Sequence, residues 1–347
     1  MAGHGTAHLR PAQDALLRAE HLVVQYPAGG GQRVQAVSDV SLDLLAGETL
    51  GLVGESGSGK SSTGRALLQL PPPDAGEVTF DGRDLTSLPR AELRQLRPQV
   101  QMIFQDPTSS LNPRRRVGDI VAEPLRIWRR GGGEEQRRRV DEVLEAVGLE
   151  PDSARHRRPH QFSGGQCQRI CVARALVLGP RILICDEPVS ALDVSVQAQI
   201  LNLLEDLKQR FGLSMVFIAH DLAVVKNVSD RVAVMYLGKL CEVGGPDELY
   251  ARPAHPYTAA LLSAVPAPDP SARPAPTTSP GEPPSPISPP SGCRFRTRCP
   301  RAEEVCATDE PVLRRVGPGH HVACHLPLVP VAEPSSDARR TVPDRPG

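Results

Sequence analysis

This sequence of 347 residues has no long hydrophobic run and no net charge. No stretch of about 18 consecutive apolar residues occurs, as a spanning helix would require, and the first thirty residues lack the basic-then-apolar pattern of a signal peptide. We therefore expect a cytosolic chain. Lys plus Arg equals Asp plus Glu at 40 each, so the charge gives no reason to expect nucleic acid as a partner.

Aromatic residues are also rare, at 3% of the chain, whereas hydrophobic residues make up 39%. The core must therefore consist mainly of Val, Leu, Ile and Ala, as in a parallel sheet covered by helices. A chain of this length is expected to form one large domain with a smaller appendage.

Short apolar runs alternate with amphipathic stretches through most of the chain. Runs typical of buried strands lie at 49–53, 100–104, 182–185, 215–219 and 232–236. Helices are expected over 61–70 and over two stretches with one apolar face, which Gly148 and Gly212 would end. Strands that alternate with helices in this way predict an α/β fold.

A glycine-rich loop follows the first apolar run. Gly54-Glu-Ser-Gly-Ser-Gly-Lys60-Ser61 matches the phosphate-binding loop at every fixed position, and it opens a predicted helix. Backbone N–H groups and the helix N-terminus would surround the phosphates, Lys60 would pair with the β- and γ-phosphates, and Ser61 would ligate Mg²⁺. The alternative, a glycine-rich turn with a chance lysine, fits this strand–loop–helix context less well. The expected nucleotide contacts are Gly54, Ser56, Gly57, Gly59, Lys60, Ser61 and Ser62.

Two adjacent carboxylates end the apolar run at 182–185. A buried acidic pair is costly unless it meets a cation or takes part in catalysis. Asp186 fits a second Mg²⁺ contact, and Glu187, which points the other way on an extended strand, fits the group that polarises the attacking water. Alone, such a pair is more often a solvated strand end, but the phosphate-binding loop upstream favours the catalytic interpretation.

The segment Phe162-Ser163-Gly164-Gly165-Gln166 resembles the signature of ABC ATPases. Further motifs of that family follow the same order along the chain: Tyr26 for the A-loop aromatic, Gln105 for the Q-loop, Asp193 for the D-loop and His220 for the switch histidine. The resemblance implies that Gln105 contacts Mg²⁺ and that His220 contacts the γ-phosphate and the attacking water. It also implies that Tyr26 stacks on adenine, although a packing role suits a tyrosine near the first strand equally well.

In this family two such domains stack head to tail, so the signature residues of one chain, Ser163 to Gln166, would complete the phosphate site of the other. Two positions depart from the usual pattern. Cys167 stands where arginine is common, and Val189 stands where threonine is common. Neither removes a catalytic group, so the resemblance implies ATP hydrolysis aided by Glu187 and His220.

Three longer segments, 101–114, 191–201 and 255–262, resemble the ATPase subunits of dipeptide and oligopeptide importers, and 96–105 looks more like the F-type subunit. The implied partners are a second ABC ATPase subunit in a heterodimer, two transmembrane permease subunits and an extracytoplasmic peptide-binding protein. The implied location is the cytoplasmic face of the membrane. The alternatives are nickel or oligosaccharide import by the same motor, or a soluble ABC ATPase acting on nucleic acid or ribosomes. The single phosphate-binding loop argues against the last.

The composition changes near residue 266, because 11 of the 25 residues in 266–290 are proline. Such a stretch forbids a regular helix and favours an extended linker. We therefore expect a nucleotide-binding domain over 1–265, with its helical subdomain at about 106–178. The linker over 266–290, a cysteine-containing extension over 291–330 and a disordered tail over 331–347 would follow.

Four of the eight cysteines crowd that extension, at Cys293, Cys299, Cys306 and Cys324. In a cytosolic chain such a cluster suggests metal before disulfides, although none of these spacings is the close pair typical of zinc. The segment resembles the C-terminal extension of peptide-importer ATPases, in which four cysteines can hold a [4Fe-4S] cluster. Reduced thiols, or zinc with His320, His321 or His325 as further ligands, are the alternatives.

Overall fold

An eight-stranded sheet forms the centre of the protein, in a computed structural model that describes residues 6–264 and 282–330. The strand order is β11-β12-β10-β9-β3-β8-β7-β6. The five strands from β9 to β6 run parallel, and the other three continue the sheet in antiparallel fashion. The bounds are β3 (Thr49–Val53), β6 (Val100–Ile103), β7 (Ile182–Asp186), β8 (Ser214–Ala219), β9 (Arg231–Tyr236), β10 (Lys239–Gly244), β11 (Arg314–Gly317) and β12 (His320–Val322).

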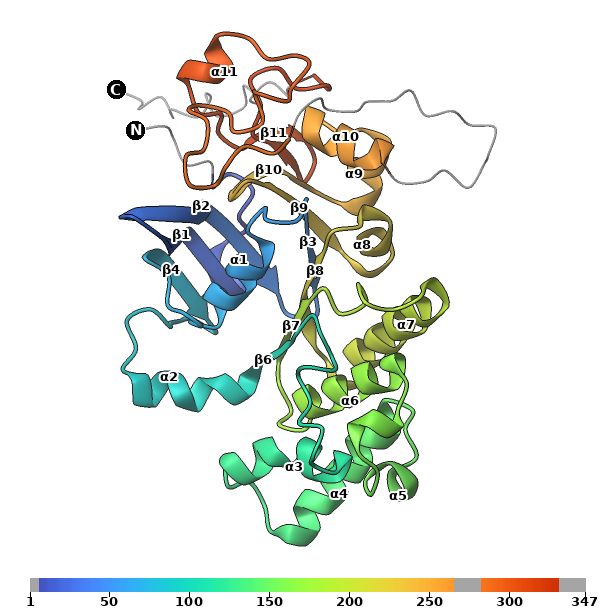
Figure 1. Cartoon of the computed structure of the whole chain (residues 1–347). Helices are drawn as coiled ribbons and strands as arrows, with labels where there is room; N and C mark the ends of the chain where they lie inside the picture. Colours follow the sequence, from blue (N-terminus) through green and yellow to red (C-terminus); the bar gives the residue numbers. More distant parts are fainter. Residues whose placement is uncertain (1–5, 265–281, 331–347) are drawn as a thin grey trace, which may run out of the picture.

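A second, antiparallel sheet has the order β2-β1-β4-β5 and lies beside α1 (Lys60–Leu67) on one side of the main sheet (Figure 1). Leu17 and Val37 of this sheet share a buried cluster with Leu52 and Ile184 of the main sheet, so the two sheets are joined by an apolar core. Its strands are β1 (Ala15–Gly29), β2 (Gln32–Leu45), β4 (Ala75–Phe80) and β5 (Arg83–Asp84).

The remaining helices include a group at the far end of the molecule from the C-terminal strands, formed by α3 to α6 (Figure 1). Val143 of α4 and Ile170 of α6 belong to a core cluster that continues into α7 and the main sheet. These helices are α2 (Arg90–Leu96), α3 (Val117–Ile127), α4 (Gly133–Ala146), α5 (Pro151–Ala154), α6 (Gly164–Leu176), α7 (Val194–Phe211), α8 (Leu222–Val228), α9 (Pro246–Ala251), α10 (Pro256–Ser263) and α11 (Val305–Thr308). Short 3₁₀ turns lie at Ala12–Asp14, Arg97–Gln99 and Pro159–Gln161. No helix in the two described ranges is long and apolar enough to cross a membrane.

The predicted parallel strands and the two glycine-terminated helices are confirmed, with two corrections. Phe104 was predicted within a buried strand, but β6 ends one residue earlier and Phe104 is 42% exposed, because β6 is the last strand of the sheet. The helix predicted over 61–70 ends at Leu67, since Gln69 adopts a positive φ and prolines follow at once. Gly212 closes α7 in the left-handed conformation that the sequence predicted for its end.

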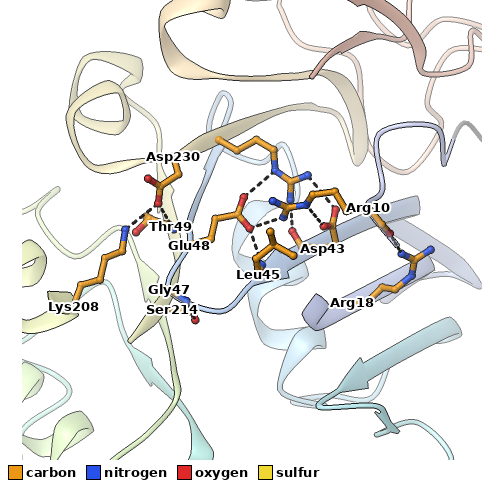
Figure 2. A network of polar contacts seen from close by, with 11 residues as sticks. Arg10, Arg18, Asp43, Leu45, Gly47, Glu48, Thr49, Lys208, Ser214 and Asp230 are labelled. Carbon is orange, nitrogen blue, oxygen red and sulfur yellow. Dashed lines mark hydrogen bonds and ion pairs between the residues drawn. The ribbon is translucent and has the colours of Figure 1, made fainter. Parts of the chain in front are cut away.

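A buried polar network joins the N-terminal segment to both sheets (Figure 2). The Asp43 side chain of β2 is 0% exposed and accepts bonds from Arg10 Nε at 2.6 Å and from Arg231 Nη1 of β9 at 3.1 Å. Arg231 Nε also lies 3.2 Å from Glu48 Oε1. Since a buried carboxylate is tolerated only when it is paired, these arginines fix how the two sheets meet.

The C-terminal segment is tied directly to the main sheet. Strand β12 pairs with β10, placing Val322 opposite Glu242, and the backbone N–H of Gln35 donates to Pro286 O at 2.9 Å. The segment after the proline-rich stretch thus packs on the nucleotide-binding core. Residues 266–281 of the predicted linker and the predicted tail over 331–347 lie outside the described residues.

Candidate nucleotide site

The predicted site residues meet where parallel strands end. Because β3, β6, β7 and β8 run in one direction, the residues that follow them emerge at the same edge of the sheet. There they line an open cleft of ≈ 850 Å³. Its lining consists of Tyr26, Val34, Ala36, Ser56, Gly57, Ser58, Gly59, Lys60, Ser61, Ser62, Gln105, Asp106, Glu187, Ser190, Ala191, His220 and Pro286.

Glycine is required at two positions of the phosphate-binding loop. A Cβ at Gly54 would lie 2.1 Å from Met235 O, and one at Gly59 would lie 2.1 Å from Ala36 O. Gly59 also has a φ of 101°, a conformation that residues with a side chain rarely adopt. The loop therefore packs tightly against β9 and β2 while its open side faces the cleft.

Lys60 is a buried ammonium held by the loop itself. Its Nζ donates to Gly54 O at 2.7 Å and to Glu55 O at 3.0 Å. Burial lowers the pKa of Lys60, whereas the nearby carboxylates of Glu187, Asp186 and Glu55 act in the opposite direction. A cation that already lies at the mouth of the loop can exchange carbonyl oxygens for phosphate oxygens.

Ser61 and Asp186 form the pair expected beside a divalent cation. The Ser61 hydroxyl donates to Asp186 Oδ1 at 2.6 Å. Asp186 is buried, and burial raises its pKa while the Ser61 hydrogen bond lowers it. A hydroxyl, a carboxylate and the nearby Gln105 amide are all oxygen donors, the ligand type that Mg²⁺ prefers, so the residues present fit this ion.

Glu187 contacts side chains from the loops that follow the two neighbouring strands, β6 and β8. Its Oε2 accepts a bond of 2.9 Å from Gln105 Nε2 and lies 3.6 Å from His220 Nδ1. Its backbone has a φ of 47°, in the left-handed region, and its N–H donates to Ile218 O at 3.0 Å. Strain of this kind is kept where it aims a side chain, and here it turns the carboxylate into the cleft.

The signature residues lie at the start of α6, outside the lining of this cleft. Ser163 Oγ accepts from Gln166 N at 3.3 Å, and Gln166 Oε1 accepts from Ser163 N at 3.0 Å, which forms a capping box. Gly164 and Gly165 make the first turn of the helix. Asp193 caps α7 in the same way through Val196 N at 3.0 Å. Hydrogen bonds from Ser195 and the helix backbone keep the pKa of Asp193 low.

The two departures from the family pattern are both accommodated by burial. Cys167 packs inside the helical core, where its thiol donates to Pro159 O at 3.5 Å and burial raises its pKa. Val189 is buried in the same cluster. Both residues therefore belong to the buried core, and neither is part of the lining of the cleft.

The structure gives no support for a metal centre among the four C-terminal cysteines. Within the described ranges no group of three or more His, Cys, Asp or Glu side chains is placed to hold a metal ion, and all four cysteines are free. Burial raises the pKa of Cys293 to about 12 and that of Cys324 to about 11. The predicted [4Fe-4S] cluster and the zinc alternative thus find no support.

Sequence reasoning missed contacts that α10 and the residues after it make with the site. Pro286 lines the cleft. Tyr257 Oη accepts the Glu55 N–H at 2.8 Å, and Arg298 pairs with the Glu55 carboxylate. Residues separated by more than 200 positions carry no local signal of such contacts, and a proline-rich stretch predicts only an extended chain.

Comparisons with known proteins agree with this geometry. A family profile described as ABC transporter matches residues 37–190, and one described as oligopeptide/dipeptide transporter, C-terminal region, matches 241–306. The oligopeptide transport ATP-binding protein OppF of Salmonella typhimurium is 53% identical over 301 residues, or 86% of this chain and 89% of its own. OppF of Haemophilus influenzae is 49% identical over 323 residues, or 90% of this chain and 97% of its own.

A solved structure is also similar. That of cbiO1 from Clostridium perfringens, part of the ABC transporter complex cbiONQ, has a TM-score of 0.61 at 28% identity, covering 69% of this chain and 91% of its own.

Proposed function

The chain belongs to the family of ABC transporter ATP-binding proteins, and we propose that it is the F-type subunit whose ATP hydrolysis powers import of oligopeptides or dipeptides. The observation that supports this proposal is the convergence of Lys60, Glu187 and His220 on one cleft beside a phosphate-binding loop, with Asp186 hydrogen-bonded to Ser61 of its lining. The match of residues 241–306 to the oligopeptide/dipeptide transporter C-terminal region supports the cargo.

Each part of the cleft has a proposed task in binding ATP. Tyr26 lies against the adenine, the loop N–H groups and Lys60 take the triphosphate, and the start of α1 adds its partial positive charge. Ser61, Asp186 and Gln105 would hold Mg²⁺, which draws charge from the phosphates when it is bound. Lys60 then leaves the carbonyls of Gly54 and Glu55 for phosphate oxygens.

Hydrolysis is assigned to the groups around Glu187. Its carboxylate accepts a proton from water while the water oxygen attacks the γ-phosphorus and the bond to the β-phosphate oxygen breaks, giving ADP and phosphate. Gln105 holds the carboxylate through its amide, and His220, whose Nδ1 lies 3.6 Å from the same carboxylate oxygen, is assigned to the γ-phosphate.

The proposed assembly with a second ATPase subunit follows from the position of the signature residues, which do not line this chain's own cleft. Ser163 to Gln166 present a helix N-terminus away from the chain's own cleft, so we assign them to the phosphate site of a second ATPase subunit. That heterodimer would drive two permease subunits from the cytoplasmic face of the membrane, and an extracytoplasmic peptide-binding protein would deliver the cargo. No step of this cycle passes through the C-terminal cysteines.

The test is ATP turnover by the assembled transporter in detergent or membranes, with the peptide-binding protein and candidate peptides added. We expect turnover to rise with peptide and to fall by a factor of about 100 or more in Glu187→Gln, because a carboxamide accepts no proton. Turnover that ignores peptide but responds to nickel or an oligosaccharide would reassign the cargo and keep the motor. Undiminished turnover in Glu187→Gln would overturn the catalytic assignment.

A further inference from the structure

The segment that follows the proline-rich stretch contacts the phosphate-binding loop at one residue, Glu55. Arg298 Nη1 donates to Glu55 Oε2 at 2.8 Å, and Arg298 Nη2 donates to Glu55 Oε1 at 3.1 Å. This is a bidentate ion pair between residues 243 positions apart. Two parallel bonds fix orientation as well as distance, which a single contact does not.

The pair is shielded on the side of the C-terminal segment. The Arg298 side chain is 11% exposed and that of Glu55 is 30% exposed. The guanidinium lies 5.7 Å from the centre of the Tyr236 ring and 5.8 Å from that of Phe295. Because the rings hold the guanidinium in place and exclude part of the solvent, this pair is stronger than an ordinary surface ion pair.

The segment carrying Arg298 is itself anchored on the core. Arg294 donates to Leu237 O, in the turn between β9 and β10, and its Nη2 donates to Gln35 Oε1 of β2 at 3.0 Å. Phe295 packs at 5.2 Å from Tyr236, between ring centres. Arg298 therefore reaches the loop from a fixed support.

Glu55 matters because its neighbours bind the nucleotide. Its backbone carbonyl accepts from Lys60 Nζ at 3.0 Å, and its N–H donates to Tyr257 Oη at 2.8 Å. Its carboxylate is a negative charge on a loop that must receive a triphosphate. Left unpaired, that charge would repel the phosphates and could draw Lys60 away from them.

We propose that Arg298 is a positioning residue of the nucleotide site, which neutralises Glu55 and holds the phosphate-binding loop ready for ATP. The inference rests on the proposed function in that ATP is the ligand. Arg298 touches no reacting atom, so its removal should weaken ATP binding and leave the chemical step nearly unchanged.

The experiment compares four full-length chains: wild type, Arg298→Gln, Arg296→Gln and the double variant Glu55→Gln with Arg298→Gln. Arg296 is a matched control, because it lies two positions away and, in the part of the chain that the structure describes, its guanidinium bonds to Ser291 and not to the loop. Dissociation constants for a fluorescent ATP analogue are measured on each chain, and KM and kcat for ATP are measured on the assembled transporter.

We expect Arg298→Gln to raise the dissociation constant and KM by about fivefold to tenfold, because an unpaired carboxylate on the phosphate-binding loop repels a triphosphate through a partly solvated surrounding, with kcat changed less than about twofold. The double variant should recover at least half of that loss, because Glu55→Gln removes the repelling charge. Arg296→Gln should match wild type.

The proposal is overturned if Arg298→Gln binds ATP as Arg296→Gln does, if the loss falls on kcat alone, or if the double variant is as weak as the single one. Should Arg298→Gln fail to fold, Arg298→Lys replaces it and must bind ATP more weakly than wild type, because lysine cannot make both bonds to Glu55; a dissociation constant equal to that of wild type overturns the proposal. A wild-type chain that neither binds nor hydrolyses ATP would instead defeat the proposed function, so the two failures are distinguishable.

Discussion

Gln105 and Glu187 are 82 positions apart in the chain, yet the amide of the first donates to the carboxylate of the second at 2.9 Å. The strands that precede them, β6 and β7, are parallel neighbours, with Ile103 opposite Cys185. Gln105 lies where the chain passes from the sheet into the helical part, and it contacts the proposed proton acceptor. A movement of the helical part would therefore shift Glu187 through this hydrogen bond.

Gln105→Ala should lower ATP turnover by about tenfold with little change in ATP binding, because Glu187 loses the donor that orients it. Steady-state turnover and nucleotide titration on the same preparations measure this. Gln101→Ala is the control, since Gln101 lies on β6, shortly before Gln105, and within the described residues its amide donates to backbone carbonyls of its own segment. Equal turnover in the two variants would show that the hydrogen bond to Glu187 has no catalytic role.

Asp186→Asn should raise the Mg²⁺ concentration for half-maximal turnover by about tenfold or more, because a neutral amide replaces the one carboxylate among the proposed ligands. Turnover is measured over a Mg²⁺ titration at saturating ATP. Asp206→Asn, on the exposed face of α7, should leave the titration unchanged. A variant of Asp186 with the wild-type Mg²⁺ dependence would remove this residue from the ligand set.

Gly59→Ala should lower the free energy of unfolding by roughly 2 kcal/mol or more, because the added Cβ meets Ala36 O in a backbone conformation that alanine disfavours. Urea unfolding measures the change. Gly30→Ala separates the two causes, since Gly30 also has a positive φ but has nothing within 4 Å of the added Cβ. It should lose only about 1 kcal/mol. If Gly59→Ala and Gly30→Ala lose the same free energy of unfolding, the phosphate-binding loop can move to accept the added Cβ, and its packing against β2 is loose.

Asp43→Ala should cost about 3 kcal/mol of unfolding free energy, because Arg10 and Arg231 would then lie partly buried without the carboxylate between them. Asp81→Ala breaks an exposed pair with Arg181 and should cost less than about 1 kcal/mol. Thermal or urea unfolding of both variants provides the comparison. A loss at Asp43 as small as that at Asp81 would contradict the structural role of the network in Figure 2.

The buried His255 predicts that stability falls as the solution is acidified. Burial lowers its pKa from 6.5 to about 4, so between these values the unfolded chain binds the proton more tightly than the folded one. The stabilisation is complete above pH 6.5 and is lost as pH falls toward 4, with roughly 2 kcal/mol gone by pH 5. Urea unfolding at pH 7 and pH 5 measures the loss.

His255→Asn is the matched variant for this effect, because asparagine does not titrate and can still cap α10 as the His255 ring does through Tyr257 N. Its unfolding free energy should depend less on pH than that of wild type. If both proteins lose the same amount between pH 7 and pH 5, the pH dependence comes from other groups, such as His321, whose pKa burial also lowers to about 4.

The parallel part of the sheet could be predicted because its strands are buried on both faces and therefore read as apolar runs. The cleft followed from it, since strands of one direction bring Gly54, Glu187 and His220 to a common edge. The antiparallel sheet was not predicted, because β1 and β2 mix buried and exposed positions and break their alternation at register shifts.

The contacts between the C-terminal segment and the loop could not be predicted, for a different reason. Glu55 looks like a variable position of the loop motif, and Arg298 looks like a charged residue in a cysteine-rich tail. Only the folded path of the chain places them together. In the same way, the number of cysteines in the extension predicted a metal site, but within the described ranges their side chains are not placed to hold a metal ion.

The pairing of β12 with β10 has a consequence for the order in which the protein is made. A ribosome completes β10 about 75 residues before it reaches β12, a delay of roughly 4–15 s at typical rates of synthesis. During that interval the growing sheet presents β10 as an open edge, to which a strand from another unfinished chain could add. In the described part of the chain β12 and β11 therefore cover the edge of β10, and a message truncated before them would yield a chain prone to self-association.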